Sequence, residues 1–87
     1  MKLHIYAYRD KKLGAYLTPM TISEEPEKAK VGIGRSLIKA DSATKAKFKD
    51  LDFYFLGSFN DETGVITSVE PALLVSLDQF CLEEGDK

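Results

Sequence analysis

The segment LDFYFLGSFNDETGVITS, residues 51–68, decides the fold. Its first half alternates as a strand does, with Phe53 and Phe55 on one side and Tyr54 and Leu56 on the other. Apolar side chains on both sides predict a central strand that is covered on both faces for part of its length. Because a small domain needs large rings in its core, we expect the two phenylalanines to be structural and not a platform for nucleobases.

A turn and further strands are expected after this strand. Residues 60–64 (NDETG) have turn chemistry, and the β-branched residues 65–67 predict a return strand. After Pro71, the apolar run 72–77 fits either a buried strand or a helix, and we favour a strand. A short helical turn is expected at residues 78–80.

The N-terminal residues predict a β-hairpin. Residues 3–9 (LHIYAYR) alternate with a period of two, which is typical of a strand. Residues 10–14 (DKKLG) end in a glycine that suits a turn, and residues 15–18 are expected to return as a second strand.

The middle of the chain predicts one main helix. Ser23 is the expected N-terminal cap, with acidic residues after it and Pro26 in the first turn. From Ala29 to Ala40, apolar residues recur at intervals of four, four and three, which is one face of a helix.

Two features qualify this helix prediction. Gly32 and Gly34 each weaken a helix by up to about 1 kcal/mol relative to alanine, and they alternatively permit close packing on a sheet or a break in the helix. Residues 43–49 are expected to add a further short turn of helix.

The predicted fold class is α+β: a small antiparallel or mixed sheet in the order β-β-α-β-β-β with one main helix. A chain of 87 residues supports one hydrophobic core, so we expect residues 1–82 to form a single globular domain and 83–87 a frayed tail.

Composition argues against several classes of protein. The longest apolar runs are a few residues, far below the ~20 that span a bilayer, and the N-terminus lacks the pattern of a secretory signal, so we expect a cytoplasmic protein without a membrane segment. Cys81 and His4 are too few for an ordinary zinc site, and neither has an evident activating partner. Residues 32–36 (GIGRS) lack most of a phosphate-loop motif. We therefore expect no enzyme activity, metal or cofactor.

Charge is divided unequally along the chain. Residues 1–49 carry eleven Lys or Arg and five Asp or Glu, whereas residues 50–87 carry one Lys and nine Asp or Glu. Such a chain can bind a polyanion with its basic half, or pair its two halves internally or between copies.

Two stretches together resemble the small nonstructural protein of gokushoviruses, which are single-stranded-DNA bacteriophages of the microvirus family. They are residues 8–16 (YRDKKLGAY) and residues 52–66 (DFYFLGSFNDETGVI). The resemblance implies an early protein in the cytoplasm of the infected bacterial host, absent from the mature virion. It also implies a role in viral DNA replication or genome packaging.

Binding of single-stranded DNA needs cations for phosphates and exposed aromatic rings for bases. The candidate nucleic-acid-binding residues are Tyr6, Tyr8, Arg9, Lys11, Lys12, Tyr16, Arg35, Lys45 and Lys47.

Several candidates also have a structural interpretation. Tyr6 and Tyr8 alternatively pack beneath the helix with their hydroxyls at its rim. The lysine run at 45, 47 and 49 is either a phosphate track or a solvated face, and its spacing suits a strand better than a helix. Arg35 either positions a phosphate or pairs with an acidic neighbour.

The leading hypothesis is a nonenzymatic phage protein that binds single-stranded DNA through its basic half. The alternative is an adaptor that docks on phage replication or procapsid proteins, or a homo-oligomer in which the two charged halves meet.

Overall fold

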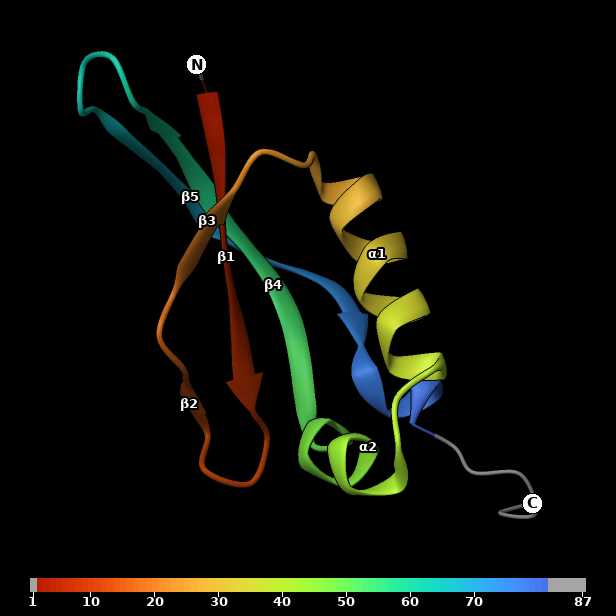
Figure 1. The fold of residues 1–87 in the computed structure, drawn as a ribbon. Coiled ribbons are helices and arrows are strands. Elements are labelled where there is room, and N and C mark those ends of the chain that lie inside the picture. The colour runs from red at the N-terminus through yellow and green to blue at the C-terminus, as the bar shows by residue number, and fades with distance from the viewer. Residues whose placement is uncertain (1, 82–87) are drawn as a thin grey trace.

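The computed structural model describes residues 2–81, which form a twisted sheet and a layer of helices (Figure 1). The α+β prediction is confirmed. The elements are β1 (Lys2–Asp10), β2 (Ala15–Tyr16), β3 (Met20–Ile22), α1 (Pro26–Ile38), α2 (Ser42–Phe48), β4 (Leu51–Asn60), β5 (Ile66–Ser76) and the 3-10 helix η1 (Leu77–Phe80). The expected tail at 83–87 lies outside the described residues.

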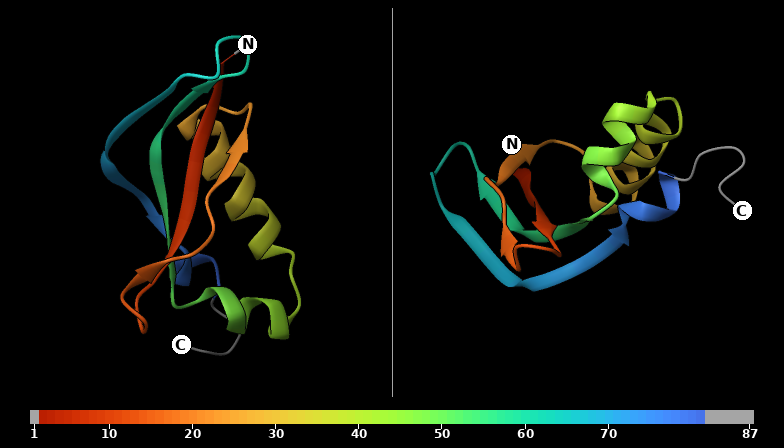
Figure 2. Two further views of the ribbon diagram at one scale, coloured as in Figure 1. Left: turned by 90° about the vertical axis from the view of Figure 1, so that its left-hand side faces the viewer. Right: turned by 90° about the horizontal axis from the view of Figure 1, so that it is seen from below.

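All strand pairs in the sheet are antiparallel. The strand order is β2-β1-β4-β5. β3 pairs with the same edge of β1 as β2 does, but nearer to the N-terminus of β1. As predicted, residues 3–9 and 15–16 form a hairpin, and the segment at 51–60 is a central strand. Both helices lie on one side of the sheet (Figure 2).

The C-terminal half of the sheet differs from the prediction, because the two strands expected at 65–67 and 72–77 are one long strand, β5. Pro71 does not separate them. β5 is an edge strand, where a missing N–H is tolerated, and its register with β4 shifts at this point: Ala72 lies opposite Phe55 and Ser68 opposite Gly57.

Helix α1 begins later than predicted. Its N-cap is Glu25, without a side-chain hydrogen bond, and Pro26 occupies the first turn. The prediction of a Ser23 cap is therefore wrong: proline at the first helical position needs no N–H partner, and it sets the helix start.

The two glycines of α1 do not break the helix. A Cβ atom at Gly34 would lie 2.9 Å from Cζ of Phe80, so this glycine permits close packing, although against η1 and not against the sheet as expected. A Cβ atom at Gly32 would meet nothing within 4 Å, so the described residues give no packing reason for this glycine.

The predicted short helix at 43–49 is α2. Asp41 caps it: the carboxylate Oδ1 accepts a hydrogen bond from the backbone N–H of Thr44 at 2.8 Å, and this bond lowers the pKa of Asp41. Lys45 and Lys47 therefore lie on a helix, where residues two apart point in different directions. The strand-like interpretation of their spacing is wrong.

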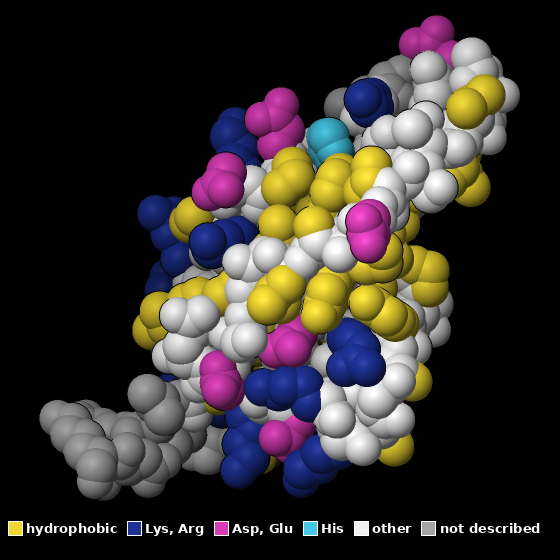
Figure 3. Space-filling view, turned by 180° about the vertical axis from the view of Figure 1, so that it is seen from behind, with side chains coloured by type: hydrophobic (Ala, Val, Ile, Leu, Met, Phe, Trp, Pro, Cys, Tyr) yellow, Lys and Arg dark blue, Asp and Glu magenta, His cyan; other side chains and the backbone are white. Residues whose placement is uncertain are grey.

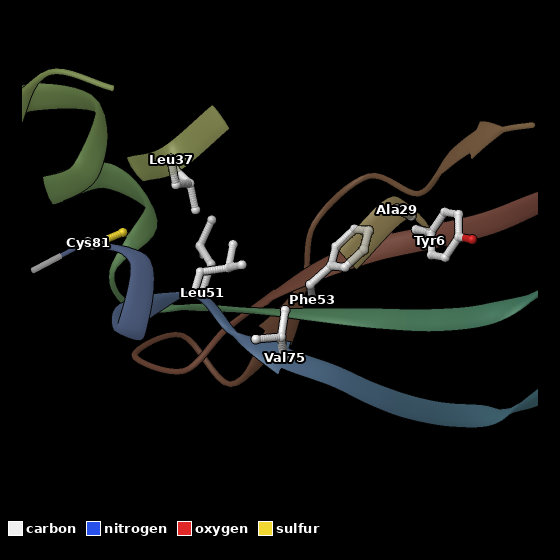
Figure 4. Close-up of a cluster of buried hydrophobic side chains, with 8 residues drawn as sticks. Tyr6, Ala29, Leu37, Leu51, Phe53, Val75 and Cys81 are labelled. Atoms are coloured by element: carbon white, nitrogen blue, oxygen red, sulfur yellow. The ribbon is translucent and has the colours of Figure 1, made fainter. Parts of the chain in front are cut away.

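The core lies between the sheet and the helices (Figure 4). Tyr6, Phe53 and Leu77 are fully buried, and Ala29 and Leu37 of α1 pack against them. We call this side of the sheet the covered face. Tyr6 lies opposite Phe55, and Tyr8 opposite Phe53, so their side chains share this face.

Candidate nucleic-acid interface

Tyr6 is part of the core. Its side chain is 0% exposed, its ring stacks on Phe53 with 5.1 Å between centroids, and its hydroxyl donates a 2.7 Å hydrogen bond to the backbone oxygen of Glu24. Burial, together with the nearby charge of Glu24, raises the pKa of Tyr6 to about 12. Tyr6 thus packs beneath α1, and its ring leaves no face for a nucleobase.

Tyr8 joins α2 to the sheet. Its half-buried ring meets Phe48 edge-on at 5.5 Å and contacts Phe53 at the same centroid distance. Burial raises the pKa of the Tyr8 hydroxyl. Tyr8 also packs on the covered face.

The lysines of the β1–β2 turn face carboxylates from the acidic half of the chain. Nζ of Lys12 lies 3.2 Å from Asp50, and Nζ of Lys11 lies 3.6 Å from Asp52 and 3.9 Å from Asp78. The backbone N–H of Lys11 also donates to the carbonyl of Asp50 at 2.9 Å. At this end of the molecule the two charged halves therefore pair internally.

Arg9 and Tyr16 lie on the uncovered side of the sheet, which we call the outer face. They are direct partners in the β1–β2 register, and Cζ of Arg9 lies 5.7 Å from the centre of the Tyr16 ring. Tyr16 also meets Tyr54 edge-on at 5.3 Å. Tyr16 is 44% exposed, so it is the most accessible of the predicted aromatic residues.

A second group of cations follows the chain from the last turn of α1 to the end of α2. This group, which we call the basic corner, consists of Arg35, Lys39, Lys45, Lys47 and Lys49. Lys45 is half-buried and the others are exposed. Within residues 2–81, none of the five lies within 4.0 Å of a carboxylate, and Asp41 is the one acidic residue between positions 35 and 49.

Helix ends explain part of this arrangement. Arg35 is in the last turn of α1, and Lys45 and Lys47 are in the last turn of α2, where cations stabilise the helix dipole. That role needs only one cation per helix, so it does not account for five. The candidate site therefore keeps Arg35, Lys45 and Lys47 and adds Lys39 and Lys49, which are the C-cap residues of the two helices.

A cleft of about 390 Å³ lies between α1 and β3. Met20, Ile22, Ile33 and Phe53 are among its apolar lining residues. Nothing in the sequence pattern indicated this cleft, because it depends on how α1 crosses β3.

Two negative findings concern the described residues. Residues 2–81 hold no group of three or more His, Cys, Asp or Glu side chains that could bind a metal ion. Likewise, no helix in this part of the chain is long and apolar enough to cross a membrane.

Fold and site define a small antiparallel α+β domain with a basic helical corner and an uncovered sheet face. A family model described as Phage ORF5 protein matches residues 3–80, so the chain belongs to the phage ORF5 protein family. No curated protein and no solved structure matches the chain. The resemblance drawn from the sequence is thus confirmed at the level of a bacteriophage protein.

Proposed function

We propose that this protein is a gokushovirus nonstructural protein that binds single-stranded DNA in viral DNA replication or genome packaging. It acts in the cytoplasm of the infected bacterium, without enzyme activity, and is absent from the mature virion. Its family and the resemblance of residues 8–16 and 52–66 support the phage context.

The basic corner is the observation that carries DNA binding. Its five cations have no carboxylate partner among the described residues, so they are free to contact phosphates. Lysine and arginine side chains bind phosphates by displacing condensed counterions, and single strands release about 0.7 ions per contact. Five contacts predict a slope of about −3.5 for log affinity against log salt.

The same reasoning removes the β1–β2 turn from the proposed interface. Lys11 and Lys12 lie within 4.0 Å of carboxylates of Asp50, Asp52 and Asp78, whose negative charges oppose the attraction of these lysines for phosphates. The two lysine groups therefore form a matched pair for an experiment, because a double substitution in either one removes two positive charges.

The test is fluorescence anisotropy with a labelled poly-dT oligonucleotide, a matched duplex as a second probe, and roughly 50 to 200 mM salt. We expect Lys45→Ala/Lys47→Ala to weaken binding at least tenfold and to reduce the salt slope by about 1 to 1.5. Lys11→Ala/Lys12→Ala should weaken binding much less. Equal losses of affinity in both variants would show that binding depends on net charge alone and not on the basic corner. Absence of binding by the wild type at low salt would refute the proposal.

The alternative function is that of a protein-binding adaptor for phage replication or procapsid proteins. The uncovered outer face favours it, since an adaptor needs a surface that another protein can cover. Competition separates the two functions: unlabelled oligonucleotides of unrelated sequence should displace the probe from a DNA-binding protein but leave a protein complex intact.

A further inference from the structure

The cleft between α1 and β3 has the composition of a small-ligand site. Its volume of about 390 Å³ lies within the roughly 300 to 1,000 Å³ that is usual for ligand pockets. Met20 and Ile22 line it from β3, and Ile33 lines it from α1. Phe53, which is 1% exposed, lies at its bottom. The cleft therefore has apolar sides between which a flat apolar group can fit.

Gly32 keeps this cleft open on the side of α1. It is one of the lining residues, and a Cβ atom at this position would meet nothing within 4 Å. A glycine here weakens the helix relative to alanine without relieving any crowding among the described residues. The space beside Gly32 is therefore open to a group from outside residues 2–81.

Polar groups also line the cleft: the carboxylate of Glu24, the ammonium group of Lys28 and the hydroxyl of Ser36. Within residues 2–81, Glu24 and Lys28 form no ion pair. Together the three side chains offer hydrogen-bond donors and acceptors beside an apolar surface. An aliphatic side chain would use only the apolar sides, whereas a ring with a polar edge would use both kinds of group.

The cleft continues toward the basic corner. A neighbouring hollow shares Glu24, Lys28 and Gly32 with it and is also lined by Arg35. Arg35 comes three positions after Gly32, so it lies about 4.5 Å farther along the helix axis. One nucleotide can therefore place its phosphate at Arg35 and its base beside Gly32.

The charges along α1 set the direction of such a nucleotide. Acidic residues precede and begin the helix at Glu24, Glu25 and Glu27, whereas Arg35 is in its last turn. The acidic end repels phosphates and the basic end attracts them. We therefore expect phosphates at Arg35, with the base pointing back along the helix into the cleft.

The outer face of the sheet lacks this combination. Figure 3 shows hydrophobic side chains over the middle of this side and, below them, Lys or Arg side chains mixed with Asp or Glu side chains. At the β1–β2 turn, Lys11 and Lys12 are paired with carboxylates. A DNA strand on this side would bring its phosphates to carboxylates, so a base site is expected on the helical side.

We propose that the cleft binds an unpaired nucleobase of the DNA strand whose phosphates contact the basic corner. This inference rests on the proposed function and adds a base site to it. The base lies between apolar side chains of β3 and α1, with its polar edge toward Glu24, Lys28 and Ser36. Bases in a duplex are stacked and paired, so they do not enter the cleft, and the protein prefers single strands.

The test compares a labelled poly-dT oligonucleotide with an abasic oligonucleotide of the same length, which has the same phosphates but no bases. Fluorescence anisotropy should show that the wild type binds poly-dT about fivefold more tightly or better, the low end of what one stacked base contributes. Gly32→Leu fills the cleft and should make the two affinities equal without changing the affinity for the abasic strand. The matched control, Gly32→Ala, adds one methyl group to the same open space and should keep the preference.

A second filling variant guards against a leucine that points into solvent. Ser36→Leu lies one helical turn after Gly32 on the same face of α1, and its leucine enters the cleft from the other end. It should also abolish the preference for poly-dT. Circular dichroism shows whether each variant is folded, and affinities are compared among folded variants.

A carbon-13 methyl label on methionine places a reporter in the cleft, because Met20 is a lining residue and the chain has two methionines. Poly-dT should move the Met20 methyl resonance through the ring current of the bound base, whereas the abasic strand should not. Thymidine monophosphate tests whether the base must belong to a strand. It should move the resonance only at much higher concentration, because it lacks the other phosphate contacts of the strand.

Failure of this proposal differs from failure of DNA binding itself. If neither oligonucleotide binds, the proposed function is refuted and the base site with it. If the wild type binds both equally, with affinities that fall with salt, only the base site is overturned. It is also overturned if both folded filling variants keep the preference, or if poly-dT leaves the Met20 resonance in place. Thymidine monophosphate that binds as tightly as the strand would overturn the assignment to DNA and indicate a pocket for free nucleotides.

Discussion

The two faces of the central strand β4 differ in whether the helices cover them, although both faces carry large apolar side chains. Phe53 is 1% exposed beneath α1, while its neighbour Tyr54 is half-buried on the outer face and meets the exposed ring of Tyr16. Both faces are apolar, but the chain folds its helices over only one. The difference shows that an apolar strand face indicates burial without saying which part of which molecule covers it.

The largest expected effect is on the covered face. Phe53→Ala should lower the free energy of unfolding by about 3–5 kcal/mol, because it leaves a cavity in the middle of the core. Tyr54→Ala, one residue along, should cost about 1–2 kcal/mol. Urea denaturation of both variants measures the difference, and equal losses would mean that the two faces are covered alike.

The next effect compares the two glycines of α1. Gly34→Ala pushes a methyl group against the ring of Phe80, and this overpacking should destabilise the protein by about 1–3 kcal/mol. The higher helix propensity of alanine offsets up to about 1 kcal/mol of that loss. Gly32→Ala meets nothing and should stabilise it by up to about 1 kcal/mol. Thermal melting shows both shifts, and the prediction fails unless their signs are opposite.

Tyr6→Phe removes the hydrogen bond to Glu24 and should cost about 1 kcal/mol near neutral pH. The folded-state pKa of Tyr6, about 12, exceeds its unfolded value of about 10. Stability from the neutral hydroxyl is therefore complete below pH 10 and is lost as pH rises toward 12.

Alkaline titration of stability checks this prediction. Tyr6→Phe should lose stability less steeply than the wild type between about pH 10 and 12. The control is Tyr16→Phe, which removes a hydroxyl from the exposed face and should follow the wild-type curve. A Tyr6→Phe curve parallel to the wild type would exclude coupling between this hydroxyl and folding.

The smallest effect on stability is expected on the outer face. Leu73→Ser should change the free energy of unfolding by no more than about 0.5 kcal/mol, because Leu73 is 53% exposed. Urea denaturation of the variant and the wild type tests this, and a loss as large as that of Phe53→Ala would contradict it.

Local patterns predicted most of the elements. Alternation in residues 3–9 and 51–58, and turn residues at 60–64, correspond to β1, β4 and the turn between β4 and β5. Asn60 shows why: its Oδ1 accepts hydrogen bonds from the N–H groups of Glu62 and Thr63, which is chemistry within the turn itself. The errors arose at Pro71 and Ser23, where the outcome depended on strand position and on the residue at the helix start.

The candidate site was less predictable. Charge counts identified a basic half, but ion pairing depends on distances across the fold. Lys11 and Lys12 proved to lie beside carboxylates some forty residues or more away in sequence, whereas Arg35 and Lys47 did not. Likewise, the aromatic residues at 6 and 8 looked equivalent to Tyr16 until α1 and α2 were placed over them.

By itself, the sequence determined the α+β class, the central strand, the hairpin and the membership of a phage protein family, since each rests on local spacing or on matched residues. Only the tertiary structure decided which aromatic rings are buried, which lysines are neutralised and which face of the sheet is bare. These properties depend on contacts between residues far apart in the chain, and such contacts exist only after β1, β4 and the helices have packed together.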